Sequence, residues 1–257
     1  MAVGPTTLPR STVTTPQAPH VPHVPRVIPE LGRLPAARWR PAEAAAARAL
    51  TLTPVGAGVH LGTGTAGQPV TLPAPSPEGA GLGVLGESLF GRLFALRLLG
   101  VGARVTAATR VPDKWRGLTL AAGDRLTVGD GVGRWPERPP SAPSAGDGPQ
   151  ALVCDLRRPP SASLAEGPWR TVVHVARNPP RRSAFWAAVR TVVVLDGQYA
   201  EVAERLLGAG AGAFVAALRG GEIAVFRDGR AETVRLDLSP GENALLTPGR
   251  RQRAATA

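Results

Sequence analysis

Short apolar runs alternate with amphipathic segments through the middle of the chain. The runs typical of buried strands are GLGVLG (81–86), ARVTAAT (103–109), DRLTVGD (124–130), QALVCDL (150–156), RTVVHVA (170–176) and RTVVVLD (190–196). The pattern between them predicts a helix over 89–99, a helical turn or short helix over 112–120 and a helix over 198–210. Strands that alternate with helices predict an α/β fold, with a mostly parallel sheet covered by helices.

Glycine-containing turns predict β-hairpins at both ends of this region. Residues 49–74 form short predicted strands, and Gly62, Gly64 and Gly67 there have the G-x-G-x-x-G spacing. A proline-containing strand follows these glycines where a phosphate-binding turn needs a helix, so the spacing indicates a hairpin turn. Towards the C-terminus, EIAVFRDGRAETVRLDL (222–238) is a second predicted hairpin that turns at RDGR.

Changes in composition divide the chain into three parts. Residues 1–48 are rich in proline, threonine and alanine, and prolines spaced through them predict an extended, disordered tail. A single α/β domain is expected over 49–240, and a basic C-terminal tail over 241–257.

The net charge of +11 comes mostly from the two ends. Residues 1–48 contain six arginines and two glutamates, and residues 249–257 contain three arginines and no acid. The region between them therefore carries only about +4. Nucleic-acid binding is accordingly expected only through the basic tails.

The sequence also indicates a cellular compartment. Cys154 is the single cysteine, which excludes an internal disulfide and is typical of a reducing compartment. No charged N-terminal segment leads into an apolar run, and no apolar stretch is long enough to span a bilayer. We expect a cytoplasmic protein without a membrane span.

The segment 81–110 contains a second G-x-G-x-x-G pattern, formed by Gly81, Gly83 and Gly86. One interpretation is an NADP-binding Rossmann oxidoreductase, in which Arg110 would meet the 2′-phosphate at the end of the next strand. Two of the glycines fall inside the predicted strand, where that fingerprint needs them after it. The other interpretation is a tight turn from a strand to a helix, with no ligand.

The order of the segments resembles the motor domain of FtsK-like P-loop ATPases, the family of DNA translocases and type VII secretion motors. The similar segments are the hairpin HLGTGTAGQPVTL (60–72), the P-loop strand, loop and helix GLGVLGESLFGRLFALRLL (81–99), the Walker B strand ALVCDL (151–156), the next strand VVHVARNPP (172–180), and the closing strand, helix and strand AAVRTVVVLDGQYAEVAERLL (187–207) with GAGAFVAAL (210–218). The resemblance covers about residues 55–238 and implies a P-loop NTPase-like core.

The chain departs from this family where the chemistry is done. A working P-loop has the pattern G-x-x-x-x-G-K-[ST], whose lysine contacts phosphates and whose hydroxyl holds Mg²⁺. Gly86 and Gly91 are spaced like its two glycines, but Arg92 and a leucine follow them. Ser88 is the expected N-cap of the helix 89–99, and Glu87 places a negative charge where a phosphate would lie.

A second departure follows the Walker B-like strand. Asp155 ends that strand, and Leu156 stands where the family carries a catalytic acid. The resemblance therefore implies a degenerate P-loop with a vestigial nucleotide site and no catalytic or metal-binding residue. The residues of that site are Gly86, Glu87, Ser88, Gly91, Arg92, Asp155 and Asn178.

The function that the resemblance implies is that of a pseudo-ATPase. We expect a structural or regulatory partner of an FtsK-like or type VII secretion motor, bound to other protein subunits in an oligomer and needing no cofactor. Two alternatives remain open: a protein that binds ATP or ADP without hydrolysing it, and the NADP-binding oxidoreductase. His174, in the middle of its predicted strand, is expected to be a hydrogen-bonded core residue.

Overall fold

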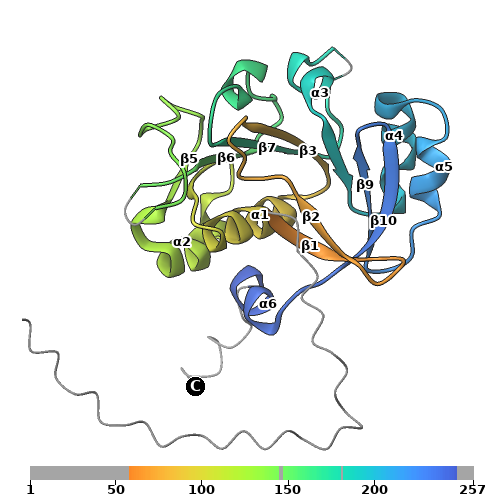
Figure 1. Cartoon of the computed structure of the whole chain (residues 1–257), viewed down its shortest axis with the longest axis horizontal. Coiled ribbons are helices and arrows are strands. Elements are labelled where there is room, and N and C mark those ends of the chain that lie inside the picture. Colours follow the sequence, from red (N-terminus) through yellow and green to blue (C-terminus); the bar gives the residue numbers. More distant parts are fainter. Residues whose placement is uncertain (1–57, 145–146, 181, 248–257) are drawn as a thin grey trace, which may run out of the picture. The chain divides into compact units, whose positions relative to one another are not determined.

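The predicted strands form one ten-stranded mixed sheet in this computed structural model, which describes residues 58–144, 147–180 and 182–247 (Figure 1). In sheet order they are β2 (Pro69–Leu72), β1 (Val59–Gly64), β10 (Arg230–Leu236), β9 (Glu222–Arg227), β8 (Thr191–Val194), β3 (Ala80–Leu85), β7 (Arg170–Ala176), β6 (Gln150–Asp155), β4 (Arg104–Thr109) and β5 (Leu126–Gly129). The strands from β8 to β5 are parallel to one another, and the others pair antiparallel. The α/β fold class is confirmed.

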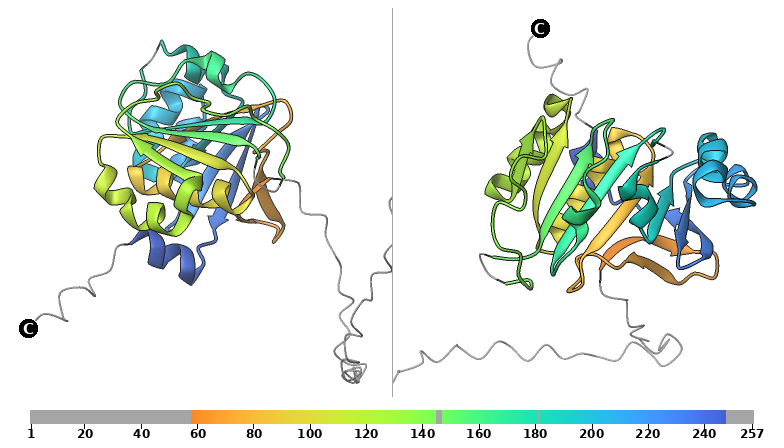
Figure 2. Two further views of the ribbon diagram at one scale, coloured as in Figure 1. Left: turned by 90° about the vertical axis from the view of Figure 1, so that its left-hand side faces the viewer. Right: turned by 90° about the horizontal axis from the view of Figure 1, so that it is seen from above.

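Helices cover both faces of this sheet (Figure 1, Figure 2). The α-helices are α1 (Ser88–Gly100), α2 (Arg116–Ala122), α3 (Ala184–Ala188), α4 (Ala200–Leu207), α5 (Ala211–Ala216) and α6 (Pro240–Leu246). Short 3₁₀ segments are η1 (Pro112–Trp115), η2 (Gly123–Arg125), η3 (Ala162–Ala165) and η4 (Gly197–Tyr199). Helices α1, α2 and α6 contact one another on one face, and α3 to α5 lie on the other.

The central strands contribute to a separate hydrophobic core on each face. Val84 of β3 packs with Phe94 of α1 on one face, whereas Leu85 packs with Phe185 and Trp186 of α3 on the other. A strand that is buried on both faces needs apolar residues at every position. This double burial explains the continuous apolar runs in the sequence.

Both predicted hairpins form, and their turns use residues with positive φ. The β1–β2 turn contains Gly67 at φ +80, so the glycine spacing there belongs to a hairpin as predicted. The β9–β10 turn places Asp228 at φ +51 and Gly229 at φ +72. Two successive residues with positive φ are typical of the tight turns that join antiparallel strands.

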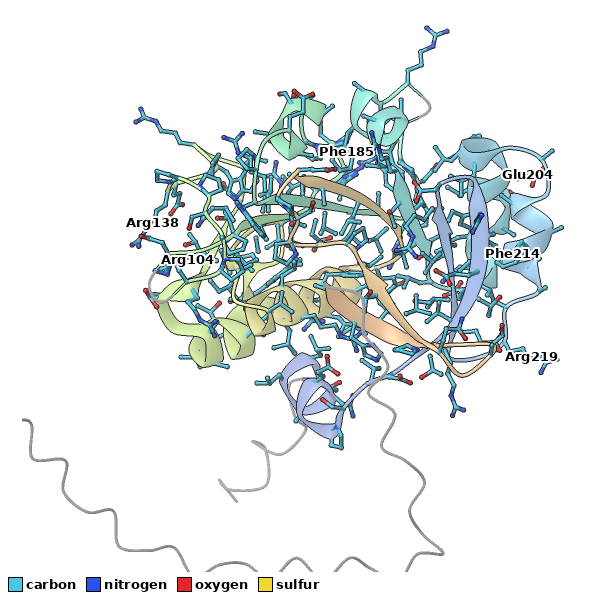
Figure 3. The ribbon with its side chains drawn as sticks, in the orientation of Figure 1. Arg104, Arg138, Phe185, Glu204, Phe214 and Arg219 are labelled. Atoms are coloured by element: carbon cyan, nitrogen blue, oxygen red, sulfur yellow. The ribbon has the colours of Figure 1, made fainter. Side chains whose placement is uncertain are left out.

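Two expectations about the C-terminal part need correction. The segment GAGAFVAAL, compared with a closing strand, instead contains helix α5, which carries Phe214 (Figure 3). The ring of Phe214 meets that of Phe226 in β9 edge to face, with their centroids 5.7 Å apart. A short apolar run fits a buried strand and a buried helix equally well, so the sequence could not separate them. Residues 241–246, assigned to the basic tail, form most of helix α6 and pack against α1.

Helix α6 has its own start signal and its own attachment to α1. Ser239 and Glu242 form a capping box, in which each side chain accepts from the backbone N–H of the other residue. Arg97 of α1 binds the Glu242 carboxylate with Nε at 2.7 Å from Oε1. The tail 1–48, the N-terminal boundary at residue 49 and residues 248–257 lie outside the described part of the chain.

No described helix combines the length and the apolar character that crossing a bilayer requires.

Candidate functional site

Neighbouring strands β3 and β7 lead into helices on opposite faces of the sheet. Helix α1 follows β3 and packs into one core, whereas α3 follows β7 and packs into the other. Where neighbouring parallel strands lead to opposite faces, their loops separate and leave a crevice outside the carboxyl ends of the strands. This crevice is the place where ligands bind in open α/β sheets.

A pocket of about 890 Å³ lies at this crevice. Five of the seven predicted site residues line it: Gly86, Glu87, Ser88, Asp155 and Asn178. The loops after β3, β4, β6 and β7 all contribute to its wall, because their strands end at the same edge of the sheet. Gly91 and Arg92 are not part of this wall.

The connection from β3 to α1 consists only of Gly86 and Glu87. The N–H of Gly86 donates to the carbonyl of Ala176 at 3.1 Å, which continues the β3–β7 ladder. A Cβ atom on Gly86 would lie 1.8 Å from Cδ1 of Leu195. Any larger residue here would have to displace the end of the Leu195 side chain, so glycine allows the close packing. The connection is also too short to surround a phosphate with N–H groups.

The glycine before it in the pattern also serves packing. Gly83 lies inside β3, and a Cβ atom there would stand 2.5 Å from Cζ3 of the Trp186 ring. The interpretation of the G-x-G-x-x-G pattern as a tight strand-to-helix turn is thus supported at Gly83 and Gly86. The NADP-binding alternative is wrong, because β7 and β6 separate β3 from β4, whereas those two strands are neighbours in a dinucleotide-binding fold.

Ser88 is the first residue of α1 and does not act as its N-cap, contrary to the prediction. Its hydroxyl instead donates to Oδ2 of Asp155 at 2.5 Å, and the hydroxyl of Thr109 donates to the same oxygen at 3.1 Å. Asp155 ends β6 and Thr109 ends β4, so this carboxylate joins the start of α1 to two strand ends.

Glu87 takes the N-cap position of α1, but its side chain makes no capping hydrogen bond. The carboxylate forms a salt bridge with Arg177, whose Nη2 lies 2.8 Å from Oε1. Both side chains are exposed, so this pair contributes little to stability. The carboxylate of Glu87 was expected where a phosphate would lie, yet it makes no hydrogen bond to the N–H groups of the first helical turn and pairs with Arg177 instead.

Gly91 and Arg92 lie within α1, on the side that faces the core. A Cβ atom on Gly91 would meet Val153 and Val175 at 3.4 Å, so this glycine allows α1 to approach the sheet. Arg92 is 8% exposed, and its Nη1 donates to the carbonyls of Lys114 and Leu246 at 2.9 Å each. Their assignment to the nucleotide site is corrected: these two residues hold elements together.

Burial and a neighbouring carboxylate act on the pKa of Arg92 in opposite directions. Removal from water lowers the pKa of its guanidinium from the ordinary value, and the nearby charge of Asp155 acts in the opposite direction. The two carbonyl groups that accept from Nη1 belong to η1 and to the end of α6. Arg92 therefore fixes the C-terminal helix against the segment that follows β4.

Sequence reasoning named Arg110 only for the NADP alternative and did not predict that several cations gather in this pocket. Its cationic lining residues are Arg110, Lys114, Arg157, Arg177 and Arg205, against the two acids Glu87 and Asp155. The side chain of Asn178 accepts a hydrogen bond from Arg205 at the pocket wall. Three of the cations, Arg110, Arg157 and Arg177, directly follow predicted strands, which is a usable signal, but only the strand order brings them together.

His174 and Cys154 lie below the pocket, inside the sheet. Trp186 Nε1 donates to His174 Nδ1 at 2.8 Å, so His174 Nε2 carries the proton that is donated to the Leu156 carbonyl at 2.9 Å. Burial lowers the pKa of His174 from its ordinary value, which confirms it as a neutral, hydrogen-bonded core residue. Burial also raises the pKa of the Cys154 thiol to about 11, so this cysteine is no thiolate nucleophile at neutral pH.

The site offers no ready-made metal centre. Within residues 58–144, 147–180 and 182–247, no three His, Cys, Asp or Glu side chains are placed to hold a metal ion together. The hydroxyl of Ser88 and the carboxylate of Asp155, which would be the nearest ligands, already bind each other. What the arrangement can do chemically is attract an anion.

Comparison with known proteins adds two similar solved structures. No protein-family model and no curated protein matches the sequence. The genome-packaging NTPase B204 of Sulfolobus turreted icosahedral virus 2, solved with ATP-gammaS, is 8% identical over 63% of this chain and 99% of its own, with a TM-score of 0.41. The cytoplasmic domain of the type VII secretion ATPase EccC from Thermomonospora curvata is 10% identical over 71% of this chain and 28% of its own, with a TM-score of 0.44. Values this low extend no activity of either protein to this chain.

Proposed function

We propose that this domain is a pseudo-ATPase, a structural or regulatory partner in an FtsK-like or type VII secretion motor assembly. The absence of catalysis is supported by the connection between β3 and α1, which is only two residues long. A hydrogen bond from Ser88 to Asp155 follows it directly. A phosphate cradle needs a longer loop of free N–H groups followed by a lysine and a hydroxyl. The chain has Arg92 at the place of that lysine, and its side chain points to other backbone groups.

The partnership rests on the order of segments in the sequence, which resembles the motor family. A domain can keep the order of segments of a motor without its catalytic residues, because a fold does not determine a function. Such a domain is suited to binding the other subunits. The proposed partners are protein subunits, a motor ATPase among them, and the assembly is oligomeric.

Two measurements test this function. Phosphate release from ATP by the purified full chain should not exceed that of a buffer blank. A turnover of about 1 s⁻¹, the low end for enzymes, would contradict the non-catalytic proposal if it disappears in the variant Asp155→Ala. Mass photometry of the full chain mixed with an FtsK-like motor from the same genome should yield a joint complex. A motor whose assembly and ATPase rate are unchanged by this protein contradicts the partnership.

A second candidate function is the binding of a nucleotide without hydrolysis. The five cationic side chains of the pocket outnumber its two acids and favour it, because a crevice with an excess of one sign of charge concentrates ligands of the other sign. Calorimetric titration with ADP tests this candidate, and the absence of binding at low salt contradicts it.

A further inference from the structure

The cations of the pocket divide into two groups by their partners. Arg177 is paired with Glu87, and Arg205 donates to Asn178. Arg110, Lys114 and Arg157, which we call the cationic triad, form no salt bridge or side-chain hydrogen bond with any residue that the structure describes. All three are exposed at the pocket. Arg205 keeps its charge beside the neutral amide of Asn178, but one of its donors is already used there. Among the described cations of the pocket, the triad is the group whose side-chain donors are all free of such partners.

The cationic triad lies at the ends of two paired strands, away from the start of α1. Arg110 directly follows β4, Lys114 is in η1 just after it, and Arg157 follows β6. Strands β4 and β6 are neighbours, with Thr109 opposite Asp155 at their last pair, so the loops that carry the triad emerge side by side. The start of α1 is occupied by the salt bridge of Glu87 and the hydrogen bond of Ser88.

The chemistry of the walls indicates what such a ligand presents. The guanidinium fork of arginine matches the oxygens of a phosphate, and several separate cations suit a ligand with several negative charges. None of the described residues that line the pocket is aromatic. Proteins that hold bases without sequence preference stack them on aromatic rings, and this pocket has no such ring to offer.

We infer that the cationic triad binds the oligophosphate group of a ligand and is indifferent to any base attached to it. Such a group occurs in nucleoside triphosphates and inorganic polyphosphate, and a row of phosphates occurs in a nucleic-acid backbone. The inference deepens the second candidate function and is independent of any protein partner.

The experiment titrates the full chain with sodium tripolyphosphate, ATP and a dT oligonucleotide in low salt. The variants are Arg110→Gln, Lys114→Met and Arg157→Gln. Arg219→Gln is the matched control, since Arg219 is an exposed arginine between α5 and β9, outside the pocket (Figure 3). Each triad variant should weaken tripolyphosphate binding about tenfold, the effect of losing one charge-assisted contact of about 1.4 kcal/mol. The control should leave it unchanged, and ATP should bind no more tightly than tripolyphosphate.

The oligonucleotide arm identifies the source of the phosphates. If the wild type binds the oligonucleotide more tightly than tripolyphosphate, and the triad variants weaken that binding, a nucleic-acid backbone is the natural ligand. If it binds tripolyphosphate more tightly than the oligonucleotide, the natural ligand is a soluble oligophosphate. The inference fails if no ligand binds, if the triad variants behave like Arg219→Gln, or if ATP binds more than about tenfold tighter than tripolyphosphate. Loss of phosphate binding leaves the proposed partnership untouched, because complex formation with a motor is measured separately.

Discussion

The hydroxyl of Ser88 donates a 2.5 Å hydrogen bond to Oδ2 of Asp155, joining the first residue of α1 to the last residue of β6. In a working P-loop NTPase, the hydroxyl that follows the loop lysine and the carboxylate at the end of the Walker B strand hold Mg²⁺. The place of that hydroxyl is taken here by Leu93, and Ser88 lies five residues before it. Asp155 instead accepts from Ser88, and the hydroxyl of Thr109 adds a second donor to the same oxygen. The carboxylate of Asp155 therefore has a structural role, which is to join the start of α1 to the ends of β6 and β4.

Asp155→Ala should therefore lower the free energy of unfolding and leave phosphate release at the blank. The change leaves the hydroxyls of Ser88 and Thr109 without their charged acceptor. For partly buried groups, this loss lowers the free energy of unfolding by about 1–3 kcal/mol. Asp155→Asn keeps an acceptor oxygen and should cost less. Urea denaturation of the three proteins measures the difference. Equal stability of wild type and Asp155→Ala would show that these hydrogen bonds contribute nothing.

The fold was predictable wherever one local feature decides an element. The run RTVVHVA became β7 because a strand buried on both faces needs apolar residues throughout, and RDGR became a turn because two residues there have positive φ. The segment around Phe214 was misassigned because short apolar runs carry no period. Helix α6 was missed although its capping box, Ser239 with Glu242, is a local signal; its contact with Arg97 of α1 joins residues far apart in the chain and could not be read from the sequence.

The site was predictable in part, and the limit has a physical origin. The resemblance to a motor family located Ser88 and Asp155, which the structure brings together across 67 positions of sequence. It misplaced Arg92, since the direction of a helical side chain depends on how the helix is rotated against the sheet. The cationic triad was not predicted as a group, because its residues meet only where β4 and β6 lie side by side in the sheet. Local sequence patterns do not reveal which strands are neighbours.

A second prediction concerns Gly83, whose hydrogen atom faces the indole ring of Trp186. Gly83→Ala places a methyl group 2.5 Å from Cζ3 of a buried, rigid ring, so β3 or α3 must move. Overpacking of this kind costs about 1–3 kcal/mol. Gly100→Ala, at the end of α1 with nothing within 4 Å of the new Cβ, is the matched control and should be neutral. Thermal unfolding compares the two; a stable Gly83→Ala would mean that the glycine serves something other than packing.

A third prediction concerns the attachment of α6. Burial of the Glu242 carboxyl tends to raise its pKa, but hydrogen bonds from Arg97 and Ser239 outweigh burial and hold the pKa below the ordinary 4.5. The folded state thus binds fewer protons, and the stability from this group is present above pH 4.5 and is lost as pH falls through the lower folded value.

Glu242→Gln should accordingly be less stable than wild type at neutral pH by about 1–2 kcal/mol, the worth of a hydrogen bond between charged groups. The gap should close in acid, because wild type then loses the same charge. Glu201→Gln, at an exposed carboxylate of α4, should show no gap at either pH. Urea denaturation at both pH values checks this, and a gap that persists in acid would contradict the assignment to charge.

The last prediction concerns His174, whose two ring nitrogens are both engaged. A second proton would have to enter at Nδ1, where the indole N–H of Trp186 already points. Burial keeps the pKa of His174 below its ordinary 6.5 in the folded state. The N–H of Trp186 acts in the same direction, because it is hydrogen-bonded to the neutral ring. Unfolded chains therefore bind more protons, so the free energy of unfolding is constant well above pH 6.5 and falls as pH drops below it, by up to about 1.4 kcal/mol per pH unit.

Trp186→Phe distinguishes this mechanism from general acid destabilisation. The variant removes the N–H that faces Nδ1, so a proton can enter there and the pKa of His174 should move back towards 6.5. The variant is expected to be less stable than wild type at about pH 8 and yet to lose less on acidification to about pH 5. Nitrogen NMR shifts of the His174 ring report its tautomer directly, with the proton expected on Nε2 in wild type. A wild type whose His174 titrates like a free histidine contradicts the prediction, because the indole would then pose no obstacle to protonation.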